Sequence, residues 1–168
     1  MNTNIEQVVL KNILTNEKYM RKVLPFVKPD YFEGTYKILF KEAGKFVGKY
    51  NKLPTAEAFK IEIDNADSFN EEQYRHAVEI IPNLFEEEKA DEQWLYESTE
   101  KWCQDRALYN AVMESISIID GKHTKLTKNA LPEILTKALG VSFDTNVGHD
   151  YIENADERYE FCLLYTSD

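Results

Sequence analysis

The sequence predicts an all-α protein: a compact helical bundle, then a long antiparallel α-hairpin, then the start of a linker helix. Only 6 of the 168 residues are Gly and 5 are Pro, fewer turn-forming residues than a β fold with many turns requires. Apolar residues recur at steps of three and four through most of the chain. The run 91–119 contains neither Gly nor Pro and predicts one helix on the order of 40 Å long.

Residues 1–90 are expected to form the bundle. Apolar spacing predicts a first helix over 4–14 and a third helix over 35–50. Between them, Asn16 is positioned to cap a short second helix that Pro25 ends.

Capping signals continue through the second half of the bundle. Thr55 is positioned as the cap of a fourth helix. Asn70 and Gln73 have the spacing of a capping box, which predicts the start of a fifth helix. Pro82 is expected to kink or end that helix, because proline lacks the amide hydrogen that a helix interior uses.

Residues 91–140 are expected to form the hairpin, with helices over 91–119 and 128–139 joined by the polar loop 120–127. A two-helix hairpin cannot cover apolar residues on both of its faces, so the surplus predicts self-association. The predicted interface residues lie at helical spacing and are Leu108, Val112, Ile116, Leu131, Leu135 and Leu139. The alternative is that these faces pack back on the 35–50 helix.

The sequence contains no constellation that predicts catalysis or metal binding. The phosphate-binding loop of ATPases needs a Gly five residues before its Gly-Lys pair, and Gly121-Lys122 has Ile116 there. The three His residues are too dispersed for a zinc site, and Cys103 and Cys162 have no motif spacing. We therefore expect no catalytic residue, no metal ligand and no cofactor within this chain.

The charge of the chain bears on DNA binding, and its hydropathy bears on the cellular compartment in which it acts. The net charge of −10 predicts no strong direct DNA binding, since phosphate contacts require Lys and Arg. A small basic run is interpreted as a solvated helix face: Lys11, Lys18, Arg21, Lys22 and Lys28. No apolar run is long enough to span a membrane and no signal peptide is recognised, so a cytoplasmic protein is expected.

Several strings resemble one family along nearly the whole chain, to about residue 161. They are Pro29-Asp30-Tyr31-Phe32-Glu33, Leu53-Pro54-Thr55, the segments 104–111 and 137–144, Val147-Gly148-His149-Asp150-Tyr151 and 155–159. Together they resemble the N-terminal collar domain of DnaB-superfamily replicative DNA helicases, and more closely those of T-even phages. The Val-Gly-His-Asp string and its distance from the hairpin carry most of the specificity.

The resemblance implies an assembly role in DNA replication. In that family the hairpins pair N-terminal domains into one tier of a hexameric ring and help to dock primase, and a helicase loader is a further possible partner. ATP and Mg²⁺ are expected for a RecA-like ATPase domain that would follow this chain. The parent would then be an ATP-dependent helicase, whereas this fragment would not be an enzyme.

The resemblance also assigns the end of the chain. Residues 141–161 match the start of the linker to the ATPase domain, with His149, Tyr151 and Arg158 as candidate linker contacts. Residues 162–168 depart from the family pattern and resemble a non-native translated tail. The alternative function is a stand-alone helical adaptor or accessory protein of replication, which a genuine stop after codon 168 would favour.

Overall fold

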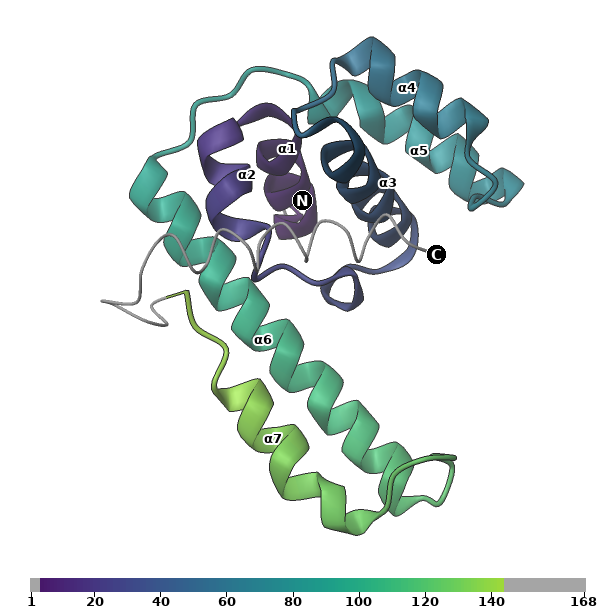
Figure 1. The fold of residues 1–168 in the computed structure, drawn as a ribbon, viewed down its shortest axis with the longest axis vertical. Helices are drawn as coiled ribbons and strands as arrows, with labels where there is room; N and C mark the ends of the chain where they lie inside the picture. Colours follow the sequence, from purple (N-terminus) through teal and green to yellow (C-terminus); the bar gives the residue numbers. More distant parts are fainter. Residues whose placement is uncertain (1–3, 144–168) are drawn as a thin grey trace.

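The computed structural model describes residues 4–143, which are helical and contain no β-strand (Figure 1). The predicted all-α class is confirmed. The α-helices are α1 (Ile5–Thr15), α2 (Glu17–Val23), α3 (Gly34–Tyr50), α4 (Ala56–Asn65), α5 (Glu71–Leu84), α6 (Glu92–Ile119) and α7 (Leu131–Leu139). Two short 3₁₀ helices are η1 (Pro29–Tyr31) and η2 (Lys128–Ala130).

The predicted caps form as expected. The side chains of Asn16 and Thr55 each accept the backbone amide three residues further along, both at 3.1 Å. Asn70 and Gln73 complete a reciprocal capping box, with bonds of 2.8 and 3.0 Å. Asp91 caps α6 in the same way at 2.8 Å. These bonds satisfy amides that the first helical turn leaves without an intrahelical partner.

Pro82, which was predicted to kink or end the fifth helix, is followed by only two further helical residues. It lies inside α5, which continues to Leu84. The missing amide costs one hydrogen bond close to the C-terminus of the helix, while Ile81 and Leu84 are buried in the core on either side. The Pro82 carbonyl then accepts the amide of Phe85, the residue that closes the helix.

Helices α1 to α5 form the bundle, with α1 in contact with α2, α3 and α5. Its interior consists of large side chains. The largest that are fully buried are Tyr19, Phe32, Phe40, Phe59, Leu10, Ile13, Leu14, Met20, Leu39, Ile63, Leu84 and Val9. The first half of α6 joins this core through Leu95 and Trp102. A buried hydrogen bond of 2.7 Å between the hydroxyls of Tyr19 and Thr99 ties α2 to α6.

The second half of α6 and the whole of α7 leave the bundle together. We call residues 105–140 the arm. Figure 1 shows α6 continuing away from the bundle and α7 returning alongside it. Gly121, with φ of +72°, follows the last turn of α6 in the left-handed conformation that glycine adopts readily at helix ends. Helix α6 meets the bundle through α1, α2 and η1, so the alternative in which the arm packs on the 35–50 helix is wrong for the described residues.

Candidate interaction surface on the arm and its junction with the bundle

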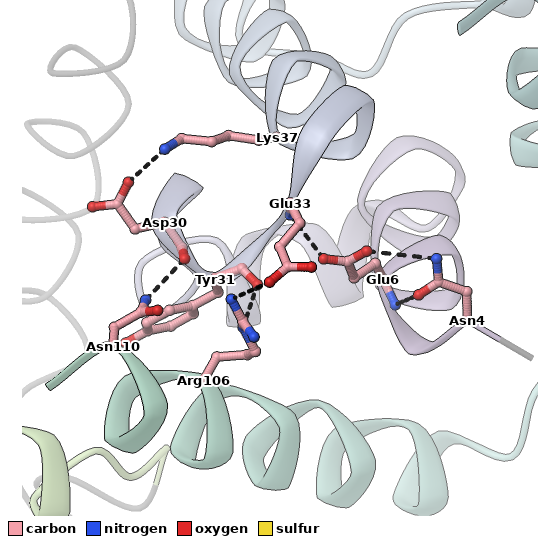
Figure 2. Close-up of polar contacts among 8 residues, drawn as sticks. All are labelled: Asn4, Glu6, Asp30, Tyr31, Glu33, Lys37, Arg106 and Asn110. Carbon is pink, nitrogen blue, oxygen red and sulfur yellow. Dashed lines mark hydrogen bonds and ion pairs between the residues drawn. The ribbon is translucent and has the colours of Figure 1, made fainter. Parts of the chain in front are cut away.

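Two side chains of α6 hold the base of the arm against the loop that contains η1 (Figure 2). Arg106 Nε donates to the Tyr31 carbonyl at 2.9 Å, and Arg106 Nη2 lies 3.1 Å from Glu33 Oε1. One turn further along, Asn110 Nδ2 donates to the Asp30 carbonyl at 2.8 Å. The strings 29–33 and 104–111, which carry part of the family resemblance, therefore contact each other directly.

The polar network continues from the junction into α1. The Glu33 amide donates to Glu6 Oε1 at 2.9 Å, and Asn4, the cap of α1, contacts the other Glu6 oxygen (Figure 2). Burial raises the pKa of the Glu6 carboxyl, although the hydrogen bonds from Glu33 and Asn4 oppose this shift. The arm is thus linked to α1 through Glu33 and Glu6.

Beneath these polar contacts lies an aromatic cluster. Trp102 of α6 packs edge-on against Tyr31 and Phe32, with ring centroids 6.0 and 4.8 Å away. Beside it, burial raises the pKa of the Cys103 thiol to about 12. Trp102 is therefore a core anchor, whereas Trp94, on the same helix, is 50% exposed.

Small side chains form the contact between α6 and α7. Ala107, Ala111 and Ser115 of α6 are buried, as is Ala138 of α7. Small residues let two helix backbones approach closely, and they leave no room for larger side chains between them. Apart from the buried Ile118, the large apolar residues of this part of α6 lie on its other side.

Those residues form one continuous surface, which we call the apolar stripe. They are Leu108, Tyr109, Val112, Met113, Ile116 and Ile119, and each is between 39% and 57% exposed. Their spacing of three and four residues places them on one side of α6 over about three turns. Scattered exposed apolar residues are ordinary, but a contiguous group of this kind indicates an interaction surface.

The six predicted interface residues divide between two environments. Leu108, Val112 and Ile116 belong to the stripe, and Leu139 of α7 is 72% exposed. Leu131 and Leu135 are half-buried, and Leu135 packs against the core. Sequence reasoning left Tyr109, Met113 and Ile119 out of the interface, although their helical spacing relative to Leu108, Val112 and Ile116 was a usable signal. Whether these residues pair with another copy stays a prediction.

The segment after α7 is fixed to the bundle side of α6. Gln104 Nε2 donates to the Val141 carbonyl at 3.0 Å, and the Phe143 amide donates to Glu100 Oε2 at 2.6 Å. The Phe143 ring packs on Phe26, with centroids 4.9 Å apart. We call these three contacts the exit clamp. The predicted linker contacts His149, Tyr151 and Arg158, most of the range 141–161 and the tail 162–168 lie outside the described residues.

The free end of the arm is a turn rather than a phosphate-binding loop. Residues 120–127 connect α6 to η2, and the Lys122 amide donates to the Ser117 carbonyl at 3.0 Å. His123 Nδ1 accepts the amides of Lys125 and Leu126 at 3.2 and 3.0 Å, which closes the turn.

Ion pairs occupy much of the basic run near the N-terminus. Lys11 pairs with Glu88 at 3.1 Å, Lys18 with Glu92 at 2.7 Å, and Arg21 with Glu17 at 2.9 Å. Across residues 4–143, no three His, Cys, Asp or Glu side chains gather as metal ligands would. In the same range, no helix combines the length and apolar character needed to cross a membrane.

Comparison with known proteins finds similarity to a DnaB-like replicative helicase of Enterobacteria phage T4. The two are 31% identical over 162 residues, an alignment that covers 91% of this chain and 34% of the helicase. The chain thus spans about a third of the length of the relative it matches. No protein-family model matches the chain. The predicted resemblance is confirmed, and the chain is homologous to a phage replicative helicase.

Proposed function

We propose that this relative of a phage DnaB-like replicative helicase is the N-terminal assembly and primase-interaction region of such an enzyme, acting in the host cytoplasm. In this proposal the chain pairs with other copies of itself within a hexameric ring and offers the ring a surface for primase. It performs no chemistry of its own, and ATP and Mg²⁺ belong to a domain that comes after it in the parent protein. Its homology to the T4 helicase supports the general role in replication.

The apolar stripe is the observation that carries the assembly role. Its six large side chains are of residue types that fill the core of the bundle, yet they are between 39% and 57% exposed. Burying apolar surface contributes roughly 25 cal/mol per Å² removed from water, so covering the stripe with a matching surface is favourable. Interfaces that assemble permanently resemble a domain core cut in half, and one side of α6 has this composition.

The anchoring of the arm supports the same role. Arg106 and Asn110 hold α6 through backbone carbonyls, and Trp102 fixes it in the aromatic cluster. A surface held rigidly before binding loses less conformational entropy when it binds. The arm is therefore suited to present the stripe in one orientation.

Sedimentation of the 168-residue chain tests the assembly role. We expect a concentration-dependent shift from monomer towards dimer between about 1 and 100 μM, the range typical of a weak biological interface. Val112→Glu and Ile116→Glu should remain folded by circular dichroism but stay monomeric. Thr124→Glu, which adds the same charge to the arm outside the stripe, is the matched control and should behave like the natural sequence.

Primase binding requires its own measurement. The primase encoded by the same phage genome should bind the chain in a calorimetric titration. Loss of this binding in the stripe variants would assign primase to the same surface, and retained binding would assign it elsewhere on the chain. No heat of binding at about 100 μM of either protein would contradict the primase part of the proposal.

A further inference from the structure

We infer that the outer face of α3 binds an acidic amphipathic helix of a partner protein. Carboxylates of this helix pair with Lys41 and Lys49, and one of its apolar side chains enters a cavity between α3 and α4. The surface belongs to the bundle rather than to the arm. Among residues 4–143, α3 contacts α1, α4, α5 and η1 but neither α6 nor α7 (Figure 1). The inference is therefore independent of the apolar stripe and goes beyond the proposed assembly role.

The outer face of α3 carries a row of lysines. A step of four residues advances about 6 Å along a helix and turns only about 40° around it, so residues at this spacing stay on one side. The row, which we call the lysine row, consists of Lys37, Lys41, Lys45 and Lys49. The opposite side of α3 holds the buried residues Leu39, Ala43 and Val47. The one acidic residue of α3, Glu42, is only 8% exposed, so the outer face is basic.

Two members of the lysine row are not neutralised by the bundle. Lys37 pairs with Asp30 at 2.9 Å, and Lys45 pairs with Glu42 at 3.3 Å. Lys41 and Lys49 are exposed, and neither makes an ion pair within the part of the chain that the structure describes. Physiological salt screens exposed charges beyond about 8 Å, so the local sign decides what binds here despite the net charge of −10. The row therefore attracts a carboxylate beside each of these two lysines.

The cavity next to the row supplies the apolar part of the site. It has a volume of about 470 Å³ and is lined by Glu42, Lys45, Phe46, Gly48, Lys49, Tyr50 and Glu62. The ring centroids of Phe46 and Tyr50 lie 4.6 Å apart, and Tyr50 is 43% exposed. Lys49 Nζ lies 5.2 Å from the centre of the Tyr50 ring, so a free cation and an aromatic wall adjoin each other. Such a cavity suits a large apolar side chain whose neighbours are acidic.

An acidic helix matches this combination better than a nucleic acid does. Acidic residues two turns apart on a partner helix have the same spacing as Lys41 and Lys49, and the same face can direct an apolar residue into the cavity. A nucleic-acid backbone carries negative charge without interruption. Phosphates that follow the lysine row would meet the carboxylates of Glu42 and Glu62 at the cavity. Lysines beside aromatic rings are also typical of single-strand binding, so an oligonucleotide is included in the test.

A designed peptide tests the site. The probe is a fluorescein-labelled peptide of about 20 residues, long enough to form a helix, with Glu at every fourth position, Leu beside them and Ala elsewhere. Fluorescence anisotropy should show binding to the 168-residue chain with a Kd between about 10 and 100 μM at low salt, and added salt should weaken it. The same peptide with Gln in place of Glu should bind at least about 10-fold more weakly, because it has no charge to pair with the row.

Substitutions locate the binding on α3. Lys41→Glu combined with Lys49→Glu should weaken binding of the Glu peptide by about 10-fold or more, since each attraction becomes a repulsion. Lys89→Glu combined with Lys125→Glu makes the same charge change at exposed positions outside α3, and this control should stay within about 2-fold of the natural chain. Tyr50→Ala should weaken binding of the Leu-containing peptide but not of a version with Ala in place of Leu. All five positions are exposed, so the variants should remain folded, which circular dichroism verifies.

Several outcomes would overturn the inference. They are equal weakening by the two pairs of lysine variants, undiminished binding of the Gln peptide, and no binding of the Glu peptide at about 200 μM of the chain. Tighter binding of a poly-dT oligonucleotide that is lost in the same α3 variants would assign the lysine row to nucleic acid instead. Sedimentation of the α3 variants should match that of the natural chain, because the stripe is unchanged. Failure of the peptide to bind therefore leaves the assembly role intact, and a strictly monomeric chain that binds the peptide contradicts only the assembly role.

Discussion

The bundle and the arm are built from similar residues arranged in opposite ways. The bundle places its large apolar side chains inside, where Phe40, Phe59 and Leu39 are fully buried. The arm places Ala107 and Ala111 inside and leaves Val112 and Ile116 exposed on the stripe. The arm also buries Ile118 and half-buries Leu135, but most of its fully buried residues are small, so it buries less apolar area than the bundle does. The difference indicates that the bundle is complete by itself, whereas the arm is suited to be completed by another surface.

The largest expected effect comes from removing the same side chain in each region. Leu39→Ala should lower the free energy of unfolding by about 2–5 kcal/mol, because it leaves a cavity in a close-packed core. Leu108→Ala should change it by less than about 1 kcal/mol, because the side chain already lies partly in water. Urea denaturation at a concentration where the chain is monomeric measures both. Equal losses would contradict the contrast between bundle and arm.

An intermediate effect is expected where α6 meets α7. Ala111→Leu should destabilise the fold by about 1–3 kcal/mol, since the close approach of the helices leaves no space for the larger side chain. The neighbouring exposed change Val112→Leu adds one carbon to the stripe and serves as the control, with almost no effect on the monomer. Amide hydrogen exchange should show the loss concentrated in 131–139. A uniform loss throughout α1 to α5 would instead mean that bundle and arm unfold as a single unit.

The smallest effect concerns the junction and depends on pH. Burial raises the pKa of Glu6 above its ordinary value, so the folded protein binds this proton more tightly than the unfolded chain does. The contribution of Glu6 to stability is therefore greatest below the ordinary pKa near 4.5 and is lost as the pH rises through the raised value. Relative to Glu6→Gln, the natural chain should become less stable between pH 4 and pH 7. Glu87→Gln, at an exposed position, corrects for the general loss of a carboxyl group, and an unchanged difference across this range would refute the assignment.

The sequence predicted the helices well because their signals are local. Asn16, Thr55 and the pair Asn70 and Gln73 mark helix starts by bonds within a few residues, and each bond forms. The helix that Pro82 was predicted to kink or end continues only two residues past it, to Leu84, because the penalty for proline is smaller near a helix end, where burial of the neighbouring residues outweighs it.

The candidate surface was predictable only in part. Periodicity identified the apolar residues of α6 and α7 but could not say which ones face each other. The contact uses Ala107, Ala111 and Ala138, whose small side chains give a weak hydropathy signal. Leu135 consequently has a half-buried position that the sequence had assigned to an interface. The junction was not predictable, because Arg106 and Asn110 bind backbone carbonyls, which have no signature in the sequence.

The exit clamp has a consequence for how this protein can change in evolution. Gln104 bonds to Val141, so the chain enters and leaves the arm at nearly the same place. Between these residues the chain runs out along α6 and back along α7, and Arg106 and Asn110 near its start also bond to the bundle. We expect the part of the arm beyond Asn110 to tolerate changes in length without moving Phe143, which packs on Phe26 of the bundle. The apolar stripe, on which the proposed assembly role rests, lies largely in this part of the arm, whereas the core and the place where the chain leaves the arm lie outside it.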